Sequence, residues 1–148
     1  MHHTYTVREE LIDLNLFILI IFISYFFVSA VSYSYLYKKK YLISYHLGMN
    51  IAMTSGGVMG IAVGTLLGYS FPGHYSLITI VATIIAIVIG AIFGALVDYQ
   101  TLLSGVSSGL MAGIMGPMIG VIADLSLVTF CTILVYASYC LLCFSIRS

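Results

Sequence analysis

Thioether and imidazole side chains recur at helical spacing in two parts of the sequence. Met49 and Met53 are four residues apart, as are Met111 and Met115, and His46 precedes the first pair by three residues. Soft ions such as Cu(I) prefer these ligands. Methionine is also an adaptable packing residue. Two interpretations therefore stay open: packing alone, or a soft-metal pathway with Met49, Met53 and His46 as ligands and no resident cofactor.

A polar face surrounds the first methionine pair. On a helix, His46, Met49, Asn50 and Met53 fall within about 100° of one another, and a glycine stripe continues the same face. This face is a candidate lining for a permeation path. The alternative is that His46 and Asn50 form hydrogen bonds between helices.

Other sulfur atoms are expected to stand apart from that face. Met111, Met115 and Met118 fall roughly opposite the glycines of their own helix, so the two methionine sets are not expected to share a site. Cys140 and Cys143 are three residues apart on an apolar segment. Buried cysteines of this kind are usually inert, and an exit ligand set is the weaker interpretation.

The combination of Met-x-x-x-Met with Gly-x-x-x-Gly resembles the arrangement in eukaryotic-type copper uptake channels. Those channels are trimers of chains with three membrane spans. Here the glycines share a helix with Met49 and Met53, and five spans are predicted. The resemblance is one of spacing, and membership in that family is not inferred.

Asp98 and Asp124 are the only carboxylates beyond the first predicted helix, and each ends a span. Each is either an interfacial residue that stops a helix or a charge at a pore mouth, and the two are expected at opposite mouths. The sequence contains no Ser/His/Asp set, no His-Glu-x-x-His and no phosphate-binding Gly-x-x-x-x-Gly-Lys. An enzyme is therefore not expected.

The composition requires lipid as the outer solvent. Of 148 residues, 61% are hydrophobic and 7% are charged, whereas about a quarter are charged in a soluble domain. The net charge is zero and the basic residues form no stripe, which excludes nucleic acid as a partner. The bilayer is the expected partner.

Apolar runs predict an all-α, polytopic membrane protein with one domain over residues 1–148. A helical span needs roughly 20 apolar residues. The predicted spans are residues 14–37, 41–69, 75–97, 101–123 and 125–146. The last break depends on Asp124 alone. The alternative is that the last two spans form one bent element, kinked at Gly116-Pro117.

Glycines recur at intervals of three or four residues in three spans and predict glycine-zipper packing, within one chain or between copies. They are Gly56, Gly60, Gly64 and Gly68 in the second span, Gly90 and Gly94 in the third, and Gly105, Gly109, Gly113, Gly116 and Gly120 in the fourth. The pattern Gly-x-Met-Gly-x-x-x-Gly occurs at Gly57 and again at Gly113. It suggests a repeat of residues 41–97 in residues 101–146.

Lys38, Lys39 and Lys40 form the only basic cluster beside a membrane end. The positive-inside rule places them in the cytoplasm of a multi-pass cell-membrane protein, with the amino terminus outside and the carboxyl terminus cytoplasmic. Two functions fit these observations. One is a small oligomeric transport or channel unit for an ion or a soft metal. The other is a non-catalytic accessory or scaffold subunit of a larger membrane complex.

Overall fold

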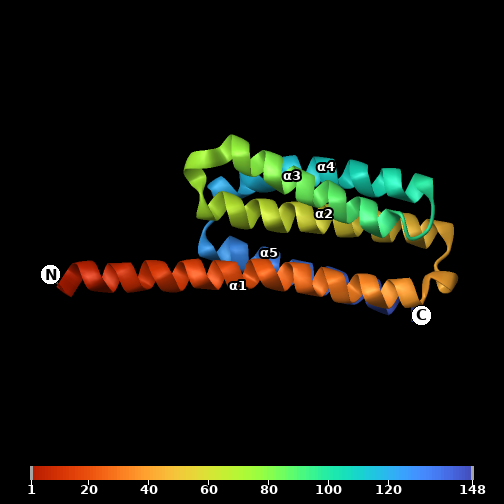
Figure 1. The fold of residues 1–148 in the computed structure, drawn as a ribbon, viewed down its shortest axis with the longest axis horizontal. Helices are drawn as coiled ribbons and strands as arrows, with labels where there is room; N and C mark the ends of the chain where they lie inside the picture. The colour runs from red at the N-terminus through yellow and green to blue at the C-terminus, as the bar shows by residue number, and fades with distance from the viewer. Residues whose placement is uncertain (1, 148) are drawn as a thin grey trace.

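The computed structural model describes residues 2–147, with side chains from residue 5 onward, and this part of the chain is all-α. Five helices, α1 to α5, are joined by short connections (Figure 1). They are α1 (His2–Lys38), α2 (Tyr45–Ser70), α3 (Tyr75–Gly94), α4 (Tyr99–Val121) and α5 (Leu125–Ser145), with short 3₁₀ turns at Lys40–Leu42 and Pro72–His74. All five are long and apolar enough to cross a membrane. The prediction of a multi-pass helical protein is confirmed.

α1 is longer than its predicted span, because the helix continues back through the charged leader to His2. No proline or glycine interrupts that leader. The amino-terminal part of α1 projects beyond the other helices (Figure 1). α4 ends at Val121 and α5 begins at Leu125. The alternative of one bent element is therefore wrong, and Pro117 lies buried inside a continuous α4.

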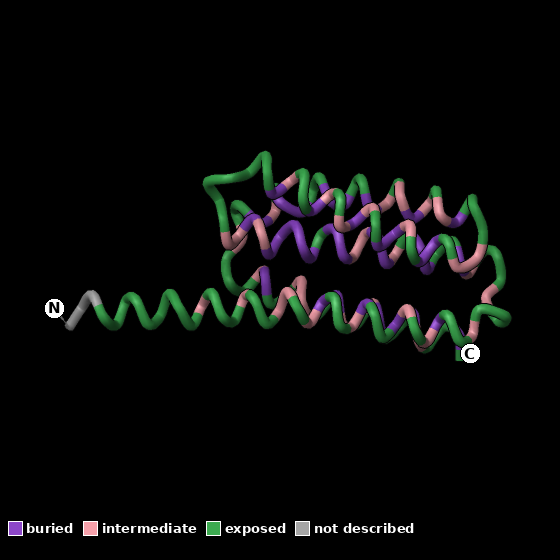
Figure 2. The backbone as a smooth tube through the Cα atoms, in the orientation of Figure 1, coloured by how far each residue is buried: buried purple, intermediate pink, exposed green. Residues whose placement is uncertain are grey.

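The helices form two groups. α2, α3 and α4 pack closely together, whereas α1 and α5 lie side by side along the α2 side of that group (Figure 1). Buried positions concentrate in α2, and α1 is the least buried helix (Figure 2). α5 packs on α2 and α1 rather than on α4, whereas α2 and α3 pack along their lengths. The second half therefore does not copy the packing of the first, and the internal repeat stays a hypothesis.

The three inner helices approach one another at glycines. A methyl group added at Gly64 would lie 2.8 Å from the Gly116 Cα, and one added at Gly116 would lie 2.6 Å from the Gly60 carbonyl oxygen. Methyl groups at Gly90 or Gly105 would collide with the other's carbonyl group. The neighbouring atoms belong to the same chain at each of these positions. The inner helices are therefore within backbone contact of each other.

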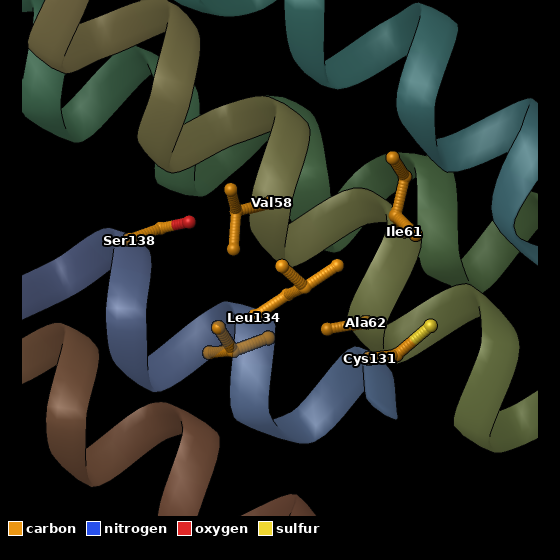
Figure 3. Close-up of a pocket in the computed structure, with 7 residues that line it drawn as sticks. Val58, Ile61, Ala62, Cys131, Leu134 and Ser138 are labelled. Atoms are coloured by element: carbon orange, nitrogen blue, oxygen red, sulfur yellow. The ribbon is translucent and has the colours of Figure 1, made fainter. Parts of the chain in front are cut away.

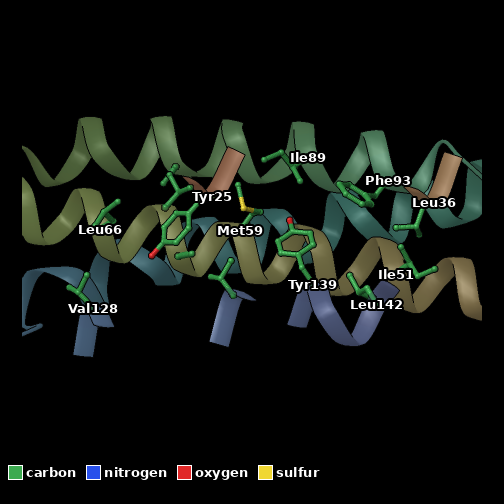
Figure 4. Packing of buried hydrophobic residues seen from close by; sticks show 14 of the residues in the cluster. Tyr25, Leu36, Ile51, Met59, Leu66, Ile89, Phe93, Val128, Tyr139 and Leu142 are labelled. Carbon is green, nitrogen blue, oxygen red and sulfur yellow. The ribbon is translucent and has the colours of Figure 1, made fainter. Parts of the chain in front are cut away.

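The two groups meet across a layer of larger side chains. Tyr25 and Leu36 of α1, Met59 of α2, Phe93 of α3 and Tyr139 of α5 are all buried in it (Figure 4). The Phe93 ring centroid lies 5.7 Å from that of Tyr33 and 6.2 Å from that of Tyr139. Aromatic packing therefore replaces backbone contact where α1 and α5 cover the inner helices.

Candidate functional site

A groove of about 500 Å³ lies along the contact between α2 and α4, and four methionines line it. Met49 and Met53 come from α2, and Met111 and Met115 come from α4. Their exposed fractions range from 37% to 67%, so the groove is open along one side. The other lining residues are Gly57, Ile61, Leu103, Ser104, Ser107, Ser108 and Ala112. These eleven residues are called the methionine–serine groove below.

Helical spacing places the groove residues on one face of each helix. Met49, Met53, Gly57 and Ile61 of α2 follow one another at intervals of four, which aligns them on one side. On α4 the polar positions precede the thioethers in the chain, with Ser104 and Ser108 before Met111 and Met115. The groove therefore changes from hydroxyl groups to sulfur along α4.

The two helices are also joined by a hydrogen bond at the groove. The Ser108 hydroxyl donates to the Met53 carbonyl oxygen at 2.7 Å. A Cβ added at Gly57 would lie 2.9 Å from the Ser108 Oγ. Gly57 therefore leaves the space that lets Ser108 reach across to α2.

The two methionine sets are not expected to share a site, yet four of their five residues line one groove. α2 packs on the Ser108–Ala112 flank of α4. That flank lies between the methionines and the glycines Gly105, Gly109 and Gly113, which face α3. Met111 and Met115 thus border α2 although they lie opposite the glycine stripe. Met118 does not line the groove.

His46 and Asn50 do not line the methionine–serine groove. Both are exposed, and the His46 ring packs edge-on against Tyr45 with centroids 5.8 Å apart. Gly57, not the buried Gly56, continues the face of Met49 and Met53. Of the four residues on the predicted polar face, Met49 and Met53 therefore line the groove, and His46 and Asn50 do not.

Asp98 and Asp124 each precede a helix at opposite ends of the bundle. The Asp98 carboxylate accepts a hydrogen bond from the Tyr99 amide at 2.7 Å, and the Thr101 hydroxyl accepts one from the Asp98 amide at 3.0 Å. This capping box stabilises the start of α4. Asp124 occupies the corresponding position before α5 without a side-chain cap. Both residues are exposed, and neither lines the groove.

The cysteines lie on α5, away from the groove. Cys131 borders a cavity of about 130 Å³ between α2 and α5, together with apolar residues and Ser138 (Figure 3). Cys140 is exposed, and the Cys143 thiol lies 3.8 Å from the Ser32 hydroxyl. Cys140 and Cys143 therefore do not extend the set of sulfur ligands formed by the methionines.

Sequence reasoning missed a polar contact between α1 and α5, called the hydroxyl seam below. The Tyr25 hydroxyl lies 2.8 Å from that of Thr132, and Ser24 lies 2.5 Å from the Tyr136 hydroxyl. Because Thr132 donates its own proton to the Val128 carbonyl, Tyr25 is the donor to Thr132. The sequence feature that could have revealed this contact is the recurrence of Ser, Thr and Tyr hydroxyl groups at helical spacing in both α1 and α5.

Among the side chains that the structure describes, from residue 5 to residue 147, no three of His, Cys, Asp or Glu lie close enough together to hold a metal ion. No model of a known protein family matches the chain, and no curated protein or solved structure matches it. Its chemistry is therefore inferred from the residues of the groove.

Proposed function

We propose that this chain is a small, oligomeric membrane transport unit for a soft monovalent metal ion, with the methionine–serine groove as part of the path. The observation that carries the proposal is the meeting of Met49, Met53, Met111 and Met115 from two helices in one groove. Thioethers bind soft ions such as Cu(I) and discriminate against hard ions. The serines of α4, of which Ser108 hydrogen-bonds to the Met53 carbonyl, offer oxygen atoms to a partly hydrated ion.

The open side of the groove supports an oligomer. A single copy encloses no path there, because the four methionines are partly exposed. Hydroxyl groups such as Ser107 are costly to leave against lipid at membrane depth. A second copy facing the groove would cover these groups and close the path between the two chains.

Glycine-zipper packing is the framework we propose for this site. Glycines of α2, α3 and α4 lie within contact distance of one another's backbones in the same chain. In lipid, such close approach supports association through dispersion and weak Cα–H···O contacts. We propose that these zippers hold α2 against α4 within each copy and leave the opposite face of the groove free for a partner.

The test is uptake of Ag(I), a redox-inert analogue of Cu(I), into liposomes containing the purified protein and a silver-sensitive dye. We expect Ag(I) uptake above the protein-free rate, without matching uptake of Na⁺. The variant M49L/M53L/M111L/M115L should fall to the protein-free rate, because leucine keeps the volume and removes the sulfur. Met118→Leu is the control, since Met118 is 58% exposed on α4 but lies outside the groove.

Two results would overturn this proposal. One is wild-type protein that moves no Ag(I), and the other is a quadruple variant that transports as fast as Met118→Leu. Purification in mild detergent tests the accessory-subunit alternative. A stoichiometric, unlike partner would favour that function, and a clean homo-oligomer would favour transport.

A further inference from the structure

A second groove, of about 420 Å³, lies between α1 and α3 on a different side of the bundle. Its wall is apolar at Phe26, Ala30, Val88, Ile89, Ile92 and Phe93, and the hydroxyl groups of Ser29, Tyr33 and Ser34 interrupt it. Ala30, Val88 and Ile92 are exposed, so this α1–α3 groove opens toward the membrane. An apolar trough with a few hydroxyl groups suits an amphipathic ligand.

Positive charge lies at one end of the α1–α3 groove. Ala30, Ser34 and Lys38 are spaced four residues apart, so they share one face of α1. Lys38 follows Ser34 by about 6 Å along the helix axis. Lys39 and Lys40 come next, and their ammonium groups lie over the rings of Tyr35 and Tyr37. The basic cluster therefore lies at the headgroup end of the groove, and the apolar part lies deeper in the membrane.

A buried hydroxyl group behind the α1–α3 groove lacks a hydrogen-bond partner. Tyr139 is 1% exposed, and its hydroxyl makes no hydrogen bond within the described chain. The phenol points away from α5 toward the α3 residues Ile89 and Phe93 (Figure 4), which line the groove from the other side. Ser29 of α1 is near this hydroxyl but outside hydrogen-bonding geometry.

Hydroxyl groups on the wall of the groove can donate to a ligand that carries hydrogen-bond acceptors. Ser29 has one proton to donate, and its oxygen can accept from Tyr139 whether or not Ser29 donates to a ligand. Such a ligand would be held by hydrogen bonds to the wall as well as by contacts of its apolar part.

We infer that the α1–α3 groove binds an anionic glycerophospholipid from the leaflet on the lysine side. The phosphate lies at Lys38, an ester carbonyl oxygen accepts from Ser34 about one helical turn deeper, and an acyl chain follows Val88 and Ile92. Basic pockets between membrane helices bind anionic headgroups in this way. This site shares no lining residue with the methionine–serine groove and does not depend on the transport proposal.

Native mass spectrometry of the full-length protein, released from nanodiscs containing phosphatidylglycerol and phosphatidylcholine, tests the inference. We expect one phosphatidylglycerol per chain to be retained in preference to phosphatidylcholine. Lys38→Gln should lower that affinity by about five-fold, the effect of one lysine near an anionic lipid. Ala30→Leu should reduce retention of the lipid because the larger side chain fills the trough.

Matched controls use the same substitutions outside the groove. Arg147→Gln removes a positive charge at the same end of the bundle, and Ala137→Leu enlarges an exposed position on α5. Both should retain phosphatidylglycerol like the wild type. If Lys38→Gln and Arg147→Gln lost equal amounts of bound phosphatidylglycerol, the lipid would be attracted by the overall charge of that end alone. If Ala30→Leu retained as much phosphatidylglycerol as the wild type, the lipid would not lie in the groove. Either result overturns the inference. So would retention of soluble glycerol phosphate, which lacks acyl chains, equal to that of phosphatidylglycerol.

Discussion

At the scale of single residues, the environments of the glycines differ in ways that spacing alone does not reveal. A Cβ at Gly116 would lie 2.6 Å from the Gly60 carbonyl oxygen, and one at Gly60 would lie 2.8 Å from the Gly113 amide nitrogen. These neighbours are backbone atoms, which move only if the helices separate. Gly73, in the turn between α2 and α3, has no atom within 4 Å of such a Cβ.

Gly116→Ala is therefore expected to destabilise the fold, and Gly73→Ala is not. Overpacking of a filled contact costs about 1–3 kcal/mol, whereas an open surface position changes stability by about 0.5 kcal/mol or less. Unfolding by SDS titration in mixed micelles, followed by circular dichroism, measures both variants. Gly73 has no positive φ, so alanine brings no backbone strain there. Equal stabilities for the two variants would contradict close packing of α2 on α4.

How far the candidate site could be predicted also depends on single residues. The four-residue spacing within the pairs Met49/Met53 and Met111/Met115 predicts thioethers one helical turn apart, and the structure places both pairs in one groove. Their meeting could not be predicted, because a helical projection fixes angles within one helix but not the direction from which the next helix approaches. The same projection places His46 and Asn50 on the face of Met49 and Met53, but neither residue lines the groove.

At the scale of elements, the hydroxyl seam joins α1 to α5 where glycines are absent. Tyr25 is fully buried in α1 and donates to Thr132 of α5. Many apolar side chains of α1 and α5 are exposed, which fits a peripheral place for both helices. The pairing of these spans was not predicted, because hydroxyl groups in membrane helices commonly bond to their own backbone. Thr129 of α5 does so.

A double-mutant cycle with Tyr25→Phe and Thr132→Val is expected to give a coupling energy of about 0.6 kcal/mol, the average for hydrogen bonds between membrane helices. The free energy of unfolding is measured by SDS titration for the wild type, the two single variants and the double variant. Thr129→Val replaces Thr132→Val in the control cycle, because the Thr129 hydroxyl donates to the Leu125 carbonyl at 2.9 Å and does not reach α1. Equal coupling in both cycles would show that the seam does not join the two helices.

At the scale of the whole molecule, the number of spans was predictable and the length of the first helix was not. Lys38–Lys40, Pro72-Gly73 and Asp98 interrupt the apolar runs, and each coincides with a turn between helices. α1 has 37 residues, about 55 Å of helix, against a bilayer core of about 30 Å. Its charged first turns have no helix breaker, so the helix extends past the bundle.

If all five helices cross the membrane, the two ends of the chain lie on opposite sides, and the charges predict which end is cytoplasmic. The end of α1 that carries the lysines lies near the carboxyl terminus, whereas the acidic residues belong to the amino-terminal part of α1, which projects at the other end of the bundle (Figure 1). The positive-inside rule predicts that the lysine end is cytoplasmic. The amino-terminal part of α1 would then extend outside the cell.

Cysteine labelling in intact cells tests this orientation in a variant with Cys131, Cys140 and Cys143 replaced by serine. We expect a membrane-impermeant maleimide to label Tyr5→Cys directly and Tyr41→Cys only after permeabilisation, because both side chains are well exposed, at 60% and 98%. Replacing all three lysines with glutamine should allow some Tyr41→Cys labelling in intact cells, since the remaining charges give little bias. Direct labelling at position 41 with the lysines present would reverse the orientation, and would place the lipid leaflet at Lys38 outside the cell.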